Sequence, residues 1–161
     1  MGRLAKVSDQ KQGDVVILQK TITSSDITVA AKDLSTPATG DFYIEDIICE
    51  SDATGIVGPT NFLVGTDNTV GLGSGMTTGL ANFETAVSGL VTTPATIAIR
   101  NAGPDCSTDR FPTVVGVCGT LSAGKKIQYA GTSAAGTGSG VVKVTVVLRR
   151  IDAHANISAA A

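Results

Sequence analysis

Apolar and polar positions alternate most regularly near the end of the chain, between Gly140 and Ile151. The even-numbered positions carry Val142, Val144, Val146 and Leu148. The odd-numbered positions carry Val141, Lys143, Thr145, Val147 and Arg149. Because successive side chains of a strand point to opposite faces, this period of two predicts a strand with one face in the core. Its second face is mixed in character, so we expect solvent or a partner there, and its five residues are candidates for a subunit interface.

Further short apolar runs, each bounded by turn residues, also predict strands. They are Asp14–Leu18, Asp26–Ala31, Phe42–Glu50, Asn61–Val64, Thr96–Arg100 and Lys125–Ala130, with Val114–Val117 as a weaker candidate. In Phe42–Glu50 the apolar pair Ile47–Ile48 breaks the alternation, which predicts a bulge near Glu45–Asp46. In Lys125–Ala130 we expect Ile127 and Tyr129 to share one face.

One segment has a helical pattern. Residues Leu80, Phe83, Val87 and Leu90 recur at spacings of three and four within Thr78–Leu90. Two glycines in this segment limit the expected helix to two or three turns. Many short strands and a single helix predict an all-β fold, an antiparallel β-sandwich of jelly-roll type with one short helix and an extended N-terminal arm.

The boundaries follow from the same pattern. Residues 1–13 are polar and lack periodicity, so they predict an extended arm. Residues 14–152 form the β-sandwich domain, and residues 153–161 form a C-terminal tail in which we expect little fixed geometry. At 161 residues and 16.2 kDa, one domain with its own core is expected.

Composition narrows the possible functions. The net charge is −2, which argues against nucleic acid as a partner because such binding neutralises several phosphates. The mean hydropathy is +0.25, yet no apolar run approaches the ~20 residues that cross a bilayer, so no membrane partner is expected. Arg3, Lys6 and Lys11 precede no apolar segment, so we expect no secretory signal and synthesis in the cytoplasm.

Reactive side chains are scarce. His154 is the sole histidine and lies in the tail, where a catalytic triad is difficult to hold. Cys49, Cys106 and Cys118 match no zinc-binding pattern, and Cys49 lies in an apolar run that predicts burial. A disulfide between Cys106 and Cys118 remains open. The acidic residues are scattered and form no calcium-loop motif. We therefore expect no enzyme activity, no metal, no cofactor and no small-molecule substrate.

The order of segments resembles a known group. A polar arm precedes Phe42–Glu50, which is followed by Asp52–Gly55, Gly58–Phe62 and Thr66–Asn68, and a valine-rich strand that runs into Arg149–Arg150 ends the domain. In this order the chain is similar to the small jelly-roll decoration, or cement, proteins on the heads of tailed bacteriophages.

The resemblance implies a structural virion protein on the outer surface of the capsid, made in the host cytoplasm. It further implies a homotrimer that braces neighbouring subunits of the phage major capsid protein. Arg3, Lys6 and Lys11 of the arm are then candidates for capsid contact.

Two other classes of protein remain as alternatives. A head fibre or tail appendage that binds a host glycan or surface protein would have the same fold, with an exposed aromatic cluster or a metal site. A small hydrolase on a β-scaffold would depend on His154.

Overall fold

The computed structural model describes residues 13–67, 76–84, 96–98, 119–131 and 134–161. This part of the chain is built from antiparallel strands and one short 3-10 turn, η1 (Ser24–Asp26). The strands are β1 (Val15–Thr23), β2 (Lys32–Asp33), β3 (Phe42–Ser51), β4 (Asn61–Asp67), β5 (Met76–Glu84), β6 (Thr96–Ala98), β7 (Gly119–Leu121), β8 (Ile127–Gly131) and β9 (Val141–Arg150). The fold is therefore all-β, as the sequence predicts.

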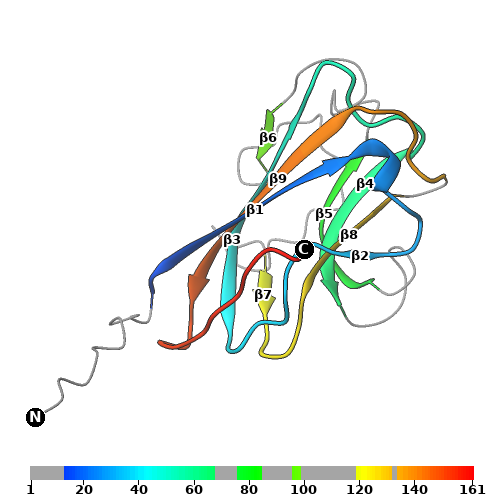
Figure 1. Ribbon diagram of the computed structural model, residues 1–161. Coiled ribbons are helices and arrows are strands. Elements are labelled where there is room, and N and C mark those ends of the chain that lie inside the picture. The colour runs from blue at the N-terminus through cyan, green and yellow to red at the C-terminus, as the bar shows by residue number, and fades with distance from the viewer. Residues whose placement is uncertain (1–12, 68–75, 85–95, 99–118, 132–133) are drawn as a thin grey trace, which may run out of the picture.

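The strands form two sheets (Figure 1). The larger sheet has the order β1-β9-β3-β6, and β7 also pairs with β3. The smaller sheet has the order β2-β8-β4-β5. Neighbouring strands of these sheets run antiparallel, and the chain crosses from one sheet to the other several times.

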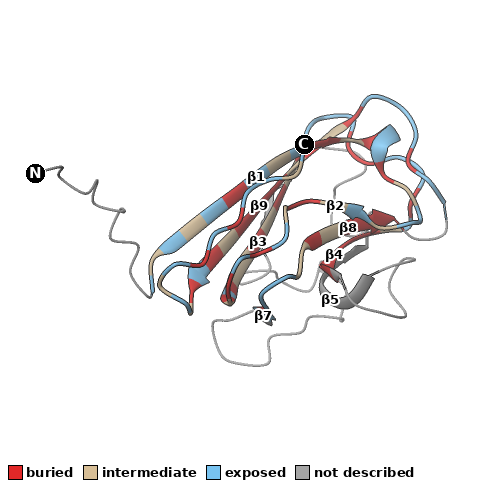
Figure 2. Cartoon of the chain, turned by 60° about the horizontal axis from the view of Figure 1, so that its bottom comes forward, coloured by how far each residue is buried: buried red, intermediate tan, exposed pale blue. Residues whose placement is uncertain are grey.

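Both sheets contribute to one core. The inward residues of β9 (Val142, Val144, Val146 and Leu148) are fully buried, as the alternation predicts. They belong to the same cluster as Phe42 of β3, Phe62 of β4 and Ile127 of β8. Figure 2 shows this burial pattern as buried and more exposed positions following one another along β1 and β3. Burial of about 25 cal/mol per Å² of apolar surface is the main force that holds such sheets together.

A bulge in β3 changes which alternate residues face the core, from the even-numbered ones before it to the odd-numbered ones after it. The pairing of β3 with β9 shifts between Ile44 and Asp46, which confirms the bulge that the sequence predicts. Before the shift, Phe42 and Ile44 are buried; after it, Ile47 and Cys49 are buried. The extra residue at Glu45 thus keeps apolar side chains in the core on both sides of the bulge.

Residues 153–161 pack against the fold, which differs from the weakly held tail that we expected. Ala155 and Ile157 are buried in the core cluster. The Arg150 side chain donates a hydrogen bond from Nε to the Ala155 carbonyl oxygen over 2.7 Å. Backbone bonds tie the tail to residues 34–39, including a bond of 2.8 Å from the Thr36 amide to the Ser158 carbonyl. Two buried apolar side chains explain this docking.

The helix predicted for Thr78–Leu90 is wrong over its first half, which lies in strand β5 (Met76–Glu84). The spacing of Leu80 and Phe83 suits a helix, but β4 offers a row of backbone partners from Asn61 to Asp67. Pairing with β4 satisfies the backbone groups of both strands, and Gly79 weakens a helix. The remainder of the predicted helix lies outside the described residues.

The strand predicted for Asp26–Ala31 is also wrong. The chain turns at η1 (Ser24–Asp26) and then leaves the larger sheet. The Ile27 carbonyl accepts a hydrogen bond from Gly136, and the Thr28 carbonyl accepts one from Gly131 at the end of β8. These single contacts hold the segment against the smaller sheet without making it a continuous strand. Buried Ile27 explains why this segment is apolar without being a strand.

The other predicted strands are confirmed, with shifted ends. Ile127 and Tyr129 of β8 are both buried, as their shared parity predicts. The segment Val114–Val117 lies outside the described residues, as does Arg100.

Two neighbouring isoleucines of β3 test the bulge. Ile47 is fully buried, whereas Ile48 is half-buried on the opposite face. We predict that Ile47→Ala lowers the free energy of unfolding by about 2–5 kcal/mol and that Ile48→Ala lowers it by less than about 1.5 kcal/mol. Urea denaturation of both variants measures the difference. Equal losses would contradict the reversal of parity at the bulge.

Candidate functional site

The outward face of the larger sheet is defined by β1, β9 and β3, whose residues lie in rows across the three strands. One row contains Val15, Arg149 and Tyr43, and the next contains Ile17, Val147 and Asp46. The following rows contain Gln19, Thr145 and Ile48, and then Thr21, Lys143 and Glu50. We call this surface the outer face.

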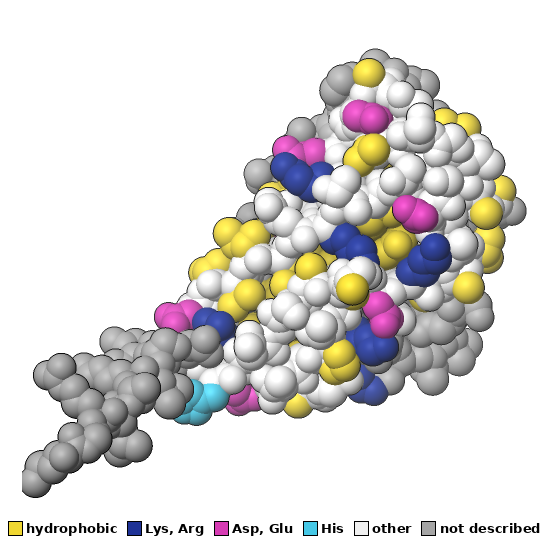
Figure 3. Space-filling model, viewed as in Figure 1, with side chains coloured by type: hydrophobic (Ala, Val, Ile, Leu, Met, Phe, Trp, Pro, Cys, Tyr) yellow, Lys and Arg dark blue, Asp and Glu magenta, His cyan; other side chains and the backbone are white. Residues whose placement is uncertain are grey.

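Large apolar side chains are exposed at one end of the outer face. Ile17 is 60% exposed, Val15 56% and Tyr43 41%. Val147 lies beside Ile17 on β9 and is half-buried. Figure 3 shows hydrophobic side chains gathered on the surface along β1. We call Val15, Ile17, Tyr43 and Val147 the outer patch.

Polar side chains on the same face already pair with one another. Arg149 forms an ion pair with Glu45 at the bulge, and Lys143 forms one with Glu50. Gln19 donates a hydrogen bond from Nε2 to the Thr145 hydroxyl over 3.2 Å. A partner that covers this face therefore removes water from groups that keep hydrogen-bonding partners.

The five residues proposed as a subunit interface from β9 alone do lie on the outer face, but they differ in exposure. Arg149 is exposed, Val141, Lys143 and Val147 are half-buried, and Thr145 is buried. β9 is the central strand of three, so side chains of β1 and β3 shield it. Sequence reasoning missed Val15, Ile17 and Tyr43, because a single strand does not reveal which strands flank it.

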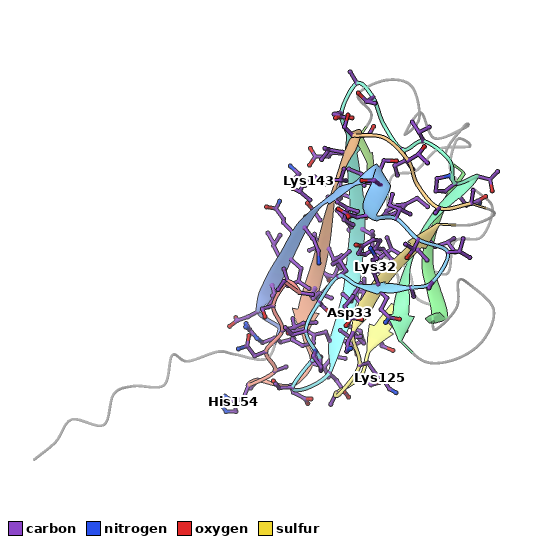
Figure 4. The ribbon with its side chains drawn as sticks, turned by 45° about the vertical axis from the view of Figure 1, so that its right-hand side comes forward. Lys32, Asp33, Lys125, Lys143 and His154 are labelled. Carbon is purple, nitrogen blue, oxygen red and sulfur yellow. The ribbon has the colours of Figure 1, made fainter. Side chains whose placement is uncertain are left out.

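The remaining candidate residues are not brought together. Arg3, Lys6, Lys11, Cys106 and Cys118 lie outside the described residues. His154 is exposed and lies at the end of the fold away from Lys143 (Figure 4). Cys49 is buried in the core, as predicted.

In the described part of the chain, no group of three or more His, Cys, Asp or Glu side chains could hold a metal. Within the same ranges, no helix is long and apolar enough to span a membrane.

A second feature is an open cleft between the edges of the two sheets. It has a volume of about 600 Å³, and its lining includes Lys20, Asp26, Lys32, Asp33 and Tyr129. Lys32 and Asp33 lie side by side on β2 (Figure 4). In Figure 3 the surface here shows hydrophobic atoms surrounded by charges of both signs.

Asp33 is held firmly in this cleft. Its carboxylate accepts bonds from Lys126 Nζ over 2.7 Å and from Gln128 Nε2 over 2.8 Å. Burial alone would raise the pKa of Asp33, but these bonds and the charges of Lys126 and Lys20 outweigh burial and hold the pKa below its ordinary value. These contacts join β2 to the β8 end of the smaller sheet, which is a structural role.

Comparison with known proteins shows a shared fold. No family model and no curated protein matches this sequence. Among solved structures, a chain from the acidic stable capsid of Helicobacter pylori bacteriophage KHP30 is similar, with a TM-score of 0.51 and 10% identity. The match covers 91% of this chain and 94% of that chain. A chain from the capsid of Ralstonia phage GP4 is similar with a TM-score of 0.51 and 12% identity, over 92% of this chain and 91% of that chain.

The Asp33 contacts make stability depend on pH. A carboxylate with a lowered folded-state pKa stabilises the fold above its unfolded pKa of about 3.9, and this contribution is lost as the pH falls through the folded pKa. We predict that Asp33→Asn destabilises the protein at pH 6 and that the difference from wild type shrinks towards pH 3. Urea denaturation across this range measures it.

A control tests whether Lys126 is the cause. In a Lys126→Met background, Asp33→Asn is expected to cost less at pH 6. A difference between the wild type and the Asp33→Asn variant that stays constant from pH 6 to pH 3 would contradict the assignment.

Proposed function

We propose that this chain is a capsid decoration protein of a tailed bacteriophage. On this proposal it binds the outer surface of the head as a homotrimer and braces neighbouring major capsid subunits. The observation that carries the proposal is the fold shared with chains of two phage capsid structures over more than nine tenths of both partners. Such mutual coverage means that the matched chains are themselves of about this length, as expected for small accessory components of a capsid.

The sheet topology supports a jelly-roll sandwich. Apart from β7, the strands pair in a nested order: β1 with β9, β2 with β8, β3 with β6, and β4 with β5. A long antiparallel hairpin rolled up on itself produces this order and places alternate pairs in two facing sheets. Two four-stranded sheets wound in this way are the jelly roll that recurs in viral capsid domains.

A cement protein needs a rigid body and a means of attachment to the shell. The core shared by both sheets supplies the rigid body, and the tail of residues 153–161 docks on it through Ala155 and Ile157. The arm of residues 1–13 is the proposed attachment, with Arg3, Lys6 and Lys11 in contact with the shell. Three arms on one trimer bind more strongly than one, because the second and third contacts form at high effective concentration.

The adhesin alternative is not favoured. The similar solved structures are capsids, and a role on the capsid requires no aromatic cluster or metal site. Nor does the proposed role require a catalytic residue or a cofactor. The shell itself is the expected partner.

Heads from the phage that encodes this chain, produced without it, provide the test. We predict that the purified protein cosediments with these heads and raises the temperature at which they release DNA. The variant with Arg3→Ala, Lys6→Ala and Lys11→Ala is expected to bind at least about tenfold more weakly, since each lost charge-assisted contact weakens attachment.

The matched control keeps the three charges through Arg3→Lys, Lys6→Arg and Lys11→Arg, and should bind nearly as well as wild type. Failure of the wild-type protein to bind heads would overturn the proposed function. Equal binding by the alanine variant would overturn the role of the arm and leave the decoration role intact.

A further inference from the structure

The outer patch is exposed apolar surface on a strand with a single neighbour among the described strands of its sheet. Among the large hydrophobic side chains whose exposure is described, Ile17 and Val15 have the largest exposed fractions. They lie on β1, which pairs with β9 on one side and forms the edge of the larger sheet. An exposed edge with apolar side chains is a surface on which another chain readily docks.

β1 carries few of the features that protect natural edge strands. Nine consecutive residues, Val15 to Thr23, pair with β9 without a break in register. The strand contains no proline, and its outward positions (Val15, Ile17, Gln19, Thr21 and Thr23) carry no charge. Edge strands that must remain single usually carry a proline, a bulge or a charged side chain. The one charge of β1 is Lys20, which alternates with the outward positions and whose Nζ donates hydrogen bonds of 3.2 Å to the Asp33 and Ala160 carbonyl oxygens. The outward positions of β1 therefore hold no charge that would repel a covering partner.

The charges on the outer face limit the kind of partner. Lys143 and Arg149 are already paired with Glu50 and Glu45 within the face. The Asp46 carboxylate, beside Val147, accepts a hydrogen bond from the Ile47 amide over 2.9 Å. A covering partner therefore needs no row of opposite charges, which nucleic acid or a strongly charged protein would present. A second protein surface that is apolar and near neutral meets the requirement, and a net charge of only −2 adds little repulsion between two copies of this chain.

The size of the face fits a contact within a larger assembly. Three strands about 4.8 Å apart and nine residues long at about 3.3 Å per residue present roughly 430 Å² of flat area. A specific interface covers about 800 Å² on each partner, so this face supplies roughly half of one. A contact of this size becomes stable when other contacts join the same copies, as in a closed ring.

We infer that a second copy of this chain covers the outer patch and that this contact holds the proposed homotrimer together. The inference rests on the proposed function for the number of copies, but its surface is assigned from the exposure and pairing of the outer face. The inferred contact is centred on Ile17 of β1 and extended by Val15, Val147 and Tyr43. It takes the place of the interface predicted from the outward residues of β9 alone.

The test places a charge in the contact. Ile17→Lys puts an ammonium group where apolar surface is buried between copies, and because Ile17 is exposed in the single chain, the fold is expected to persist. Sedimentation equilibrium over a concentration series should show wild-type trimers, with half-assembly of Ile17→Lys requiring at least about a tenfold higher concentration. Ile17→Thr, which keeps a β-branched side chain, should give a smaller shift.

Val29→Lys is the matched control, because Val29 is 45% exposed and lies between η1 and β2, outside the three strands that form the outer face. It should assemble like wild type. Circular dichroism and thermal unfolding confirm that each variant is folded.

The outcomes separate the inference from the proposed function. A wild-type monomer at all concentrations, or Ile17→Lys that assembles like wild type, would overturn the inference. If Ile17→Lys keeps the wild-type mass but no longer binds heads, the shell covers the patch and the inference is wrong, whereas the decoration role stands. Loss of assembly by Ile17→Lys but not by Val29→Lys is the result we expect.

Discussion

The larger sheet depends on β9, which pairs along its whole length with β1 on one edge and with β3 on the other. Its inward side chains are all fully buried, so its register cannot slip by one residue without moving four apolar side chains into solvent. This constraint fixes the position of β1. It also explains the bulge in β3, because one extra residue restores burial after Ile44 where the apolar parity of β3 changes.

The same register also creates the outer face. It places Thr145 opposite Gln19, and Lys143 opposite Glu50, so the polar groups of neighbouring strands satisfy one another. The apolar residues Val15 and Ile17 fall on the edge strand, where no further strand of the described sheet shields them. A rigid core and an uncovered apolar margin therefore arise from a single pairing pattern. In a monomer such a margin is a liability, and in the proposed assembly of copies it is a contact.

The sequence predicted well where one residue pattern determines the outcome. The strict alternation of β9 and the broken alternation of β3 are both read directly from side-chain character, since core burial requires them. The prediction failed where pairing with a distant strand determines the structure of a segment. The spacing of Leu80 and Phe83 suits a helix, and only pairing with β4 makes that segment a strand.

The candidate interface shows the same limit. The alternation of side chains identifies the outward residues of β9, but it does not tell whether a strand is central or at the edge of a sheet. Thr145 is buried for this reason, and the exposed apolar residues belong to β1 and β3. Likewise, the docking of Ala155 and Ile157 depends on a core cluster that many distant residues form, which no local pattern in the tail could indicate.

An electron cryomicroscopy map of heads that carry this chain tests the central claim most directly. The account predicts two-sheet domains in groups of three on the outer surface, each with the face formed by β1, β9 and β3 turned towards a neighbouring copy. Isolated copies, or domains on the inner surface of the shell, would contradict it.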